Sequence, residues 1–217
     1  VSLDMNGLGD TGARALASGL VGHWDLEVMH ACGNRIGDEG ARALARAMAR
    51  HEHLAVVHLG DNLVGDAGAG ALGEALASAV GLRELYLGVN AIGQAGAQGL
   101  SEGLGAHRNL RLIALDSNKL GNAGAVALGR GLARARALRE LFLASNGIGD
   151  EGALELAALA EGLPQLVVLD MQMNLVTESV RGSLSAAGTA RVHGNLDTGS
   201  ASSKETGHRV KGVTSHG

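Results

Sequence analysis

Aromatic residues, proline and cysteine are scarce in this chain of 217 residues. Trp24, Tyr86 and Phe142 are the three aromatic residues, and Pro164 is the single proline. Cys32 is the single cysteine, which excludes an intrachain disulfide and fits a reducing compartment. The sequence has no N-terminal signal pattern and no apolar run of about 18 residues, as a membrane span requires. We therefore expect a cytoplasmic protein that does not bind membranes.

The balance of charges provides no overall positive field. The formal net charge is −4 at pH 7, so we expect no nucleic acid partner held by general electrostatic attraction. Glycine is abundant instead, and its 35 copies are roughly twice the average share of ~7 %. Because these glycines follow a fixed period and proline is nearly absent, they indicate tight packing and not a flexible linker.

Asparagines recur every 28 residues, and the apolar residues keep the same period. Positions are numbered below relative to this asparagine, which is position 0. Apolar residues stand at −8, −5, −3 and +2, and those at −5 and −3 alternate with variable residues. Such alternation is typical of a short strand with one buried face. The recurring asparagines are Asn6, Asn34, Asn62, Asn90, Asn118, Asn146 and Asn174.

The second half of each repeat changes to a helical period. Glycine stands at +3, Gly-Ala at +6 and +7, leucine at +10 and a further apolar residue at +14. Small residues on this stripe let the helix lie close to the strand layer. The side chains at +4 can accept hydrogen bonds from the free N–H groups of a helix start. These acceptors are Asp10, Asp38, Asp66, Asn122 and Asp150, and Gln94 is the exception.

Each repeat therefore predicts one strand, a turn and one helix. A single repeat cannot bury its apolar face alone, so neighbouring repeats must stack to form one continuous core. Helices are wider than strands, and the stack should curve for that reason. We expect an α/β solenoid of 28-residue repeats, with parallel strands on the concave face and helices on the convex face.

The repeated motif L-x-x-L-x-L-x-x-N-x-[IL] resembles the leucine-rich repeat of the ribonuclease-inhibitor type. Its clearest copy spans 138–153, and 36–45 is also similar to repeats of NOD-like receptors. The resemblance covers about residues 1–195. It implies a horseshoe fold and an asparagine ladder, in which each side chain bonds backbone groups in the turn after its strand. All seven asparagines are therefore interpreted as structural.

The pattern weakens at both ends of the chain. Val1 stands five positions before Asn6, so the first repeat begins within a strand and lacks a polar cap. We expect further repeats, or another domain, to precede it in the natural protein. At the other end we predict a short helix at 178–187, a weak strand at 190–192 and a disordered tail at 196–217. The predicted leucine-rich repeat domain, of about seven repeats, is thus 1–195.

Positions −6, −4 and −2 are predicted to face the concave surface. Tyr86 and Phe142 both stand at −4, and exposed aromatic side chains are typical anchors for a partner. A single exposed aromatic can equally lack a function. Acidic residues share this face and favour a partner with basic groups. The predicted partner-binding residues are Tyr86, Phe142, Glu84, Asp116, Glu140, Asp170, His58 and His30.

A column of arginines at −7 leaves an alternative open for these acids. Arg83, Arg111 and Arg139 stand directly before positions −6, where Glu84 and Glu140 lie. Local ion pairs between the two columns would neutralise the acidic face. A partner with basic groups would then have no particular advantage.

No catalytic residue, metal or cofactor is predicted. His30, His58 and Cys32 lie on adjacent predicted strands, but a structural zinc site normally has four ligands. Cys32 also lacks a third group that would orient a neighbouring histidine as its base. The recurring glycines at +3 and +6 lack the Lys-Ser/Thr of a phosphate-binding loop. The chain is therefore not expected to be an enzyme.

The predicted function is protein–protein interaction along the concave strands. One alternative is a regulatory or substrate-recruiting segment of a larger protein, such as a ubiquitin-ligase adaptor, a NOD-like sensor or a microbial effector. Ran-type GTPase-activating proteins share this repeat class, and the resemblance would imply an arginine offered from an N-terminal repeat. No residue of this sequence could be matched to that arginine.

Overall fold

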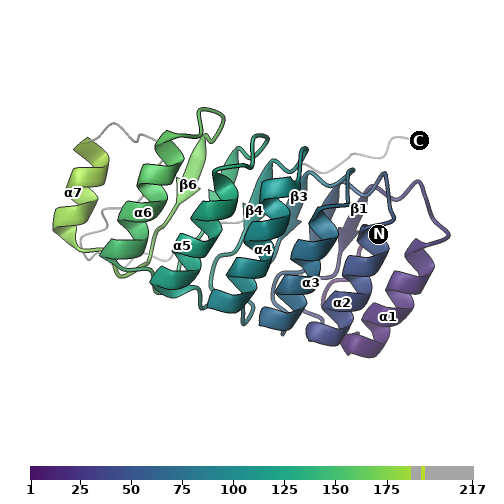
Figure 1. Ribbon diagram of the computed structural model, residues 1–217. Coiled ribbons are helices and arrows are strands. Elements are labelled where there is room, and N and C mark those ends of the chain that lie inside the picture. Colours follow the sequence, from purple (N-terminus) through teal and green to yellow (C-terminus); the bar gives the residue numbers. More distant parts are fainter. Residues whose placement is uncertain (187–191, 194–217) are drawn as a thin grey trace, which may run out of the picture.

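The computed structural model describes residues 1–186 and 192–193, which form a curved solenoid of two layers (Figure 1). The repeats around Asn34 to Asn174 each contribute one strand and one helix, whereas the first repeat contributes one helix and an isolated bridge between Ser2 and His30. The helices are α1 (Gly9–Leu20), α2 (Asp38–Met48), α3 (Asp66–Leu76), α4 (Gln94–Ala106), α5 (Gly121–Leu132), α6 (Asp150–Glu161) and α7 (Glu178–Ala186). The strands are β1 (Val28–His30), β2 (Val56–His58), β3 (Glu84–Tyr86), β4 (Leu112–Ala114), β5 (Glu140–Phe142), β6 (Val168–Asp170) and β7 (Val192–His193).

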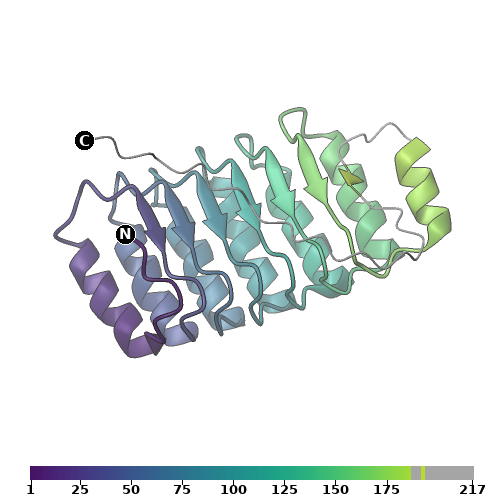
Figure 2. The ribbon, with the colours of Figure 1, turned by 180° about the vertical axis from the view of Figure 1, so that it is seen from behind.

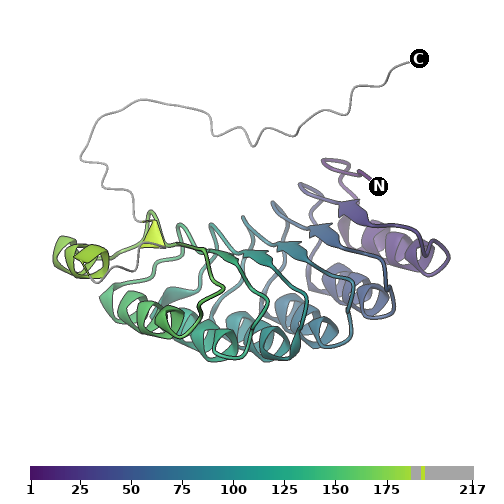
Figure 3. The ribbon, with the colours of Figure 1, turned by 90° about the horizontal axis from the view of Figure 1, so that it is seen from above.

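The strands form one parallel sheet in chain order from β1 to β7. The register pairs identical repeat positions, so that His30 lies beside His58 and His58 beside Tyr86. Figure 2 shows the strands side by side in front of the helices, and Figure 3 shows them on the inner side of the curve. The predicted solenoid, with concave strands and convex helices, is confirmed.

The core lies between the strands and the helices and is built from aliphatic side chains. In one repeat, Val57 and Leu59 at −5 and −3 meet Ala69 and Leu72 at +7 and +10, and all four are 0 % exposed. Strands β1 to β6 consequently bury their middle residue and leave −6 and −4 on the other face. The core therefore fills without any aromatic side chain, which leaves Tyr86 and Phe142 for the concave surface.

The asparagine ladder is present and joins successive repeats. Asn62 Oδ1 accepts the N–H groups of Asn34 and Ile36, at 3.1 and 2.9 Å. Its Nδ2 donates to the carbonyls of Ala31 and Leu59, both at 3.0 Å. One side chain thus satisfies backbone groups of its own repeat and of the preceding one. This confirms the structural interpretation of the ladder.

The residue before each asparagine adopts a left-handed backbone conformation, which the sequence pattern did not indicate. In all seven repeats φ at −1 lies between 52° and 64°. At Val89 this conformation is unfavourable for a β-branched residue, at a cost of ~1–2 kcal/mol. The ladder bonds hold the turn whatever its side chain, so no common residue type reveals it. The residues concerned are Met5, Gly33, Asp61, Val89, Ser117, Ser145 and Met173.

The acceptors at +4 cap helix starts, but in the following repeat. Asp38 Oδ1 accepts the N–H groups of Gly65 and Gly68 at the start of α3, at 2.7 and 2.9 Å. Asp10 and Asp66 act in the same way on α2 and α4. A Cβ on Gly68 would lie 2.7 Å from Asp38 Oδ1, which explains the glycine at +6. Capping therefore also links neighbouring repeats.

The last repeat departs from the 28-residue period. α7 confirms the predicted helix at 178–187 as far as Ala186, and Ala187 lies outside the described residues. β7 pairs Val192 with Leu169 and His193 with Asp170, so the predicted strand at 190–192 is confirmed at Val192, and 190–191 lie outside the described residues. The tail at 196–217 and the domain boundary at 195 lie outside the described residues and stay predictions.

A buried histidine ties the end of α4 to the next strand. His107 is 5 % exposed, and its Nδ1 accepts the N–H groups of Asn109 and Leu110, both at 3.0 Å. Its Nε2 therefore carries the proton and donates to the carbonyl of Ala79, at 3.0 Å. Burial lowers the pKa of His107, against the opposing effect of the Ala79 carbonyl. Protonation of Nδ1 would break two hydrogen bonds.

Acidification is therefore expected to destabilise the fold through His107. Its pKa is lowered from 6.5, so its contribution is complete above that value and is lost as pH falls through the folded-state pKa. The His107→Asn variant keeps an acceptor at the Nδ1 position without titrating. Urea unfolding at about pH 7.5 and about pH 5.5 should show a smaller loss of stability in this variant than in the unmodified chain. Equal losses would assign the pH dependence to other groups.

Candidate binding surface

The −4 positions of β1, β2 and β3 carry three rings that stack across the concave face. The ring centroids of His30 and His58 are 4.4 Å apart, and the two planes differ by 15°. Those of His58 and Tyr86 are 3.9 Å apart, and their planes differ by 13°. Since the sheet is parallel and in register, side chains at one repeat position must lie in a row. We call His30, His58 and Tyr86 the ring row.

Hydrogen bonding and burial hold the ring row in one arrangement. The Tyr86 hydroxyl donates to Glu84 Oε2 at 2.9 Å. Burial and this bond raise the pKa of Tyr86, so its hydroxyl stays protonated. Burial and then the neighbouring His30 lower the pKa of His58, which favours the neutral ring. The row is thus partly buried, its His58 and Tyr86 rings are uncharged, and it needs little reordering to contact a partner.

Phe142 lies on the same face but apart from the ring row. Ala114 separates it from Tyr86, because the register places Tyr86 beside Ala114 and Ala114 beside Phe142. Two strand spacings correspond to about 10 Å. Among the ring contacts of the described residues, none joins Phe142 to Tyr86. The two predicted anchors therefore lie two strands apart and do not form one cluster.

The predicted acidic residues surround Phe142 and Tyr86. Glu84 and Glu140 stand at −6 of β3 and β5, Asp170 lies beside Phe142 on β6, and Asp116 follows β4. Asp116 Oδ1 accepts the N–H of Ala144 at 2.9 Å. Burial raises the pKa of Asp116, and Asp170 raises it further, against the effect of its backbone hydrogen bonds. The concave face thus carries carboxylates near both predicted anchors, Tyr86 and Phe142.

The arginines at −7 do not neutralise these carboxylates. In residues 1–186 and 192–193, the ion pair found is between Arg42 and Glu39 on α2. Arg83, Arg111 and Arg139 therefore form no ion pair with the neighbouring glutamates at −6 within the described structure. The alternative of local neutralisation is not supported, and both charges stay available to partners.

Little in the described residues supports a metal site or a reactive cysteine. No three His, Cys, Asp or Glu side chains of the described residues are grouped so as to hold a metal ion. His30 and His58 present ring faces to each other. Burial, followed by the charge of Asp4, raises the pKa of Cys32 and disfavours a reactive thiolate. In the described part of the chain, no helix is long and apolar enough to span a bilayer.

The sequence and the fold were compared with known protein families, curated proteins and solved structures. A family model described as "Leucine Rich repeat" matches residues 1–17, 33–45, 50–73, 106–129 and 136–157. No curated protein matches the chain. Among solved structures, internalin C2 of Listeria monocytogenes is similar, with 20 % sequence identity and a TM-score of 0.46. That match covers 84 % of this chain and 75 % of the internalin chain.

Proposed function

We propose that this chain, whose repeats match the leucine-rich repeat family model and stack into one parallel sheet, binds a protein partner along its concave strand face. Solenoids of stacked repeats offer extended concave surfaces for binding. The ring row carries the proposal. Its three rings lie on the open face of the sheet, whereas the hydrophobic core of the described residues is built from Leu, Ile, Val, Ala and Met. Rigid aromatic side chains lose little entropy on binding and are frequent anchors.

Charge narrows the class of partner. Glu84, Glu140, Asp116 and Asp170 lie beside the ring row and Phe142, and they form no ion pairs among the described residues. Complementary charge mainly accelerates association and selects among partners. A partner that presents basic side chains to this face is therefore favoured. Metal or nucleotide chemistry is not needed for such a function.

The ring row has a structural explanation as well, and the experiment must separate the two. Stacked cross-strand rings can stabilise a sheet by about 0.5–1.5 kcal/mol per pair. A structural role alone predicts that Tyr86→Ala lowers the melting temperature and leaves affinity intact. A binding role predicts a loss of affinity that exceeds the loss of stability.

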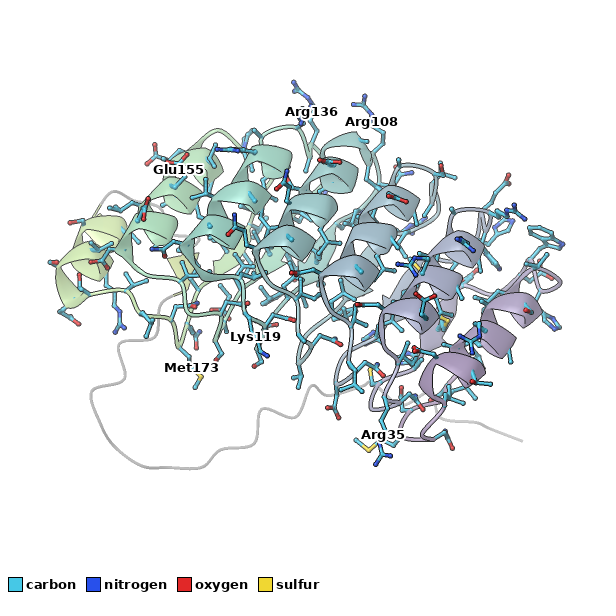
Figure 4. The ribbon with its side chains drawn as sticks, turned by 60° about the horizontal axis from the view of Figure 1, so that its bottom comes forward. Arg35, Arg108, Lys119, Arg136, Glu155 and Met173 are labelled. Carbon is cyan, nitrogen blue, oxygen red and sulfur yellow. The ribbon has the colours of Figure 1, made fainter. Side chains whose placement is uncertain are left out.

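Substitution of Tyr86 and Phe142 by alanine tests the proposal. The partner is first isolated by affinity capture, and its affinity is then measured by calorimetry for each variant. Each substitution is expected to weaken binding by about tenfold or more, which is typical of an aromatic anchor. Glu155→Ala is the control, because Glu155 is exposed on convex helix α6 (Figure 4). Unchanged affinity in both aromatic variants would refute concave binding.

A further inference from the structure

A second charged surface lies at the edge where the strands begin. Five arginines line a groove of about 360 Å³ there, together with small and amide side chains. We call it the arginine groove. Its lining residues are Val80, Gly81, Arg83, Arg108, Asn109, Arg111, Arg136, Ala137, Arg139 and Gln165.

The fold builds this groove from two columns of arginines. Arg83, Arg111 and Arg139 stand directly before β3, β4 and β5, and the Arg111 N–H donates to the Arg83 carbonyl at 2.7 Å. The Arg139 N–H donates to the Arg111 carbonyl at 2.8 Å. Each of these arginines is therefore one strand spacing from the next. Arg108 and Arg136 follow α4 and α5, and Figure 4 shows both side chains extending from one edge.

Comparison between repeats shows that the fold does not require arginine at these positions. Cations near a helix C-terminus are favoured by the helix dipole, but that benefit is open to every repeat. Arginine is nevertheless confined to three neighbouring copies at −7 and to two at −10. The other copies are Glu27, Ala55 and Val167 at −7, and Trp24, Glu52, Val80 and Pro164 at −10.

The positive charge of the groove is not balanced within the protein. All five arginines are exposed, no carboxylate lines the groove, and no ion pair in the described residues involves them. The Asn109 amide donates to the Val80 carbonyl at 2.7 Å, and the Gln165 amide to that of Ala135 at 3.2 Å. Like charges held this close repel one another, whereas the whole chain carries a net charge of −4. An anion would relieve this repulsion.

We propose that the arginine groove binds a short acidic segment of a protein, through clustered carboxylates or phosphates. Planar guanidinium groups bind both kinds of oxyanion with paired hydrogen bonds. Three strand positions span about 10 Å, which three or four residues of an extended peptide cover. This site goes beyond the concave function, because it requires no contact with the ring row.

A peptide fits the groove better than a nucleic acid. Single-stranded nucleic acids gain affinity from bases stacked on aromatic side chains, and no aromatic residue lines this groove. Glu84 and Glu140 also follow Arg83 and Arg139 directly in the chain. A longer phosphate backbone that crossed onto the concave face would meet these carboxylates.

Fluorescence anisotropy with synthetic peptides tests the proposal on the full chain. The probes are a labelled peptide with four consecutive glutamates, the same peptide with phosphoserines, the same peptide with glutamines, and an oligouridine RNA. We expect the glutamate and phosphoserine peptides to bind, the two arms showing which oxyanion is preferred, and the glutamine peptide not to bind. The double variant Arg111→Glu with Arg136→Glu should weaken acidic-peptide binding by about tenfold or more.

Two control variants make the result specific. Arg46→Glu reverses an exposed charge on α2, outside the groove, and Tyr86→Ala removes the ring-row anchor. Both should leave acidic-peptide binding within about twofold, so this site can succeed or fail independently of concave binding. Equal binding to the double variant, shown folded by circular dichroism, would overturn the proposal. Absence of acidic-peptide binding, or tighter binding of the RNA, would overturn it too.

Discussion

Replacing Asn62 by alanine is expected to lower the free energy of unfolding by about 4 kcal/mol, because it leaves several buried backbone groups unpaired. The Asn62 side chain accepts two backbone N–H groups through Oδ1. Through Nδ2 it donates to three carbonyls. Each buried group left without a partner costs about 1–3 kcal/mol, although relaxation and water entry recover part of the sum. A change of this size would be among the largest for a single polar residue.

Asn6→Ala provides the matched control for this prediction. Asn6 stands at the same repeat position but is exposed, and its Nδ2 donates to the Asp4 carbonyl at 3.0 Å. We expect a loss below about 1 kcal/mol, which is typical of an exposed hydrogen bond. Urea unfolding followed by circular dichroism measures both variants. Similar losses at Asn6 and Asn62 would show that the ladder does not carry the stability assigned to it.

Gly73→Ala is expected to destabilise the chain by about 3 kcal/mol, although alanine is the better helix former by about 1 kcal/mol. A Cβ on Gly73 would lie 2.1 Å from the carbonyl oxygen of Gly99 on α4. The obstacle is backbone and cannot move aside as a flexible side chain could. A side chain at Gly103 on α4 is excluded in the same way, since its Cβ would lie 2.0 Å from the carbonyl oxygen of Gly73. α3 and α4 would have to separate.

Gly70 lies one turn before Gly73 on the same helix and supplies the control. A Cβ on Gly70 would meet nothing within 4 Å. Gly70→Ala should therefore raise stability by up to about 1 kcal/mol through helix propensity alone. Thermal and urea unfolding of both variants would give opposite signs. If Gly73→Ala were neutral or stabilising, the close approach of α3 and α4 would be wrong.

The architecture could be predicted because one period governs both halves of the repeat. Asn62 marks the end of a strand, and Leu72 ten residues later lies on the buried stripe of a helix, so both layers follow from counting. The capping partners could not be predicted in this way. Asp38 bonds Gly65 and Gly68 of the next repeat, a contact that depends on how the repeats stack. The left-handed turn at Val89 likewise arises from ladder bonds and not from its own preference.

The candidate surfaces were predictable only in part. The repeat frame places Tyr86 and Phe142 on one face, but the stack of His30, His58 and Tyr86 depends on side-chain conformations. The sequence also suggested that the arginines at −7 pair with nearby glutamates, which the described structure does not show. Arg108 lies three positions before this column. Arg108 lines the groove because of the conformation of the turn after α4. The spacing of apolar residues does not predict that conformation.

The most direct test of concave binding uses the scarcity of aromatic residues. The chain has one Tyr, one Phe and one Trp, so isotope labelling of each of these residue types in turn gives ring signals that composition assigns. Trp24 lies in the turn after α1, away from the ring row, and contacts His51. When the captured partner is added, we predict that the ring signals of Tyr86 and Phe142 shift or broaden while that of Trp24 stays in place. Unmoved Tyr86 and Phe142 signals in a saturated complex would contradict binding through the concave face.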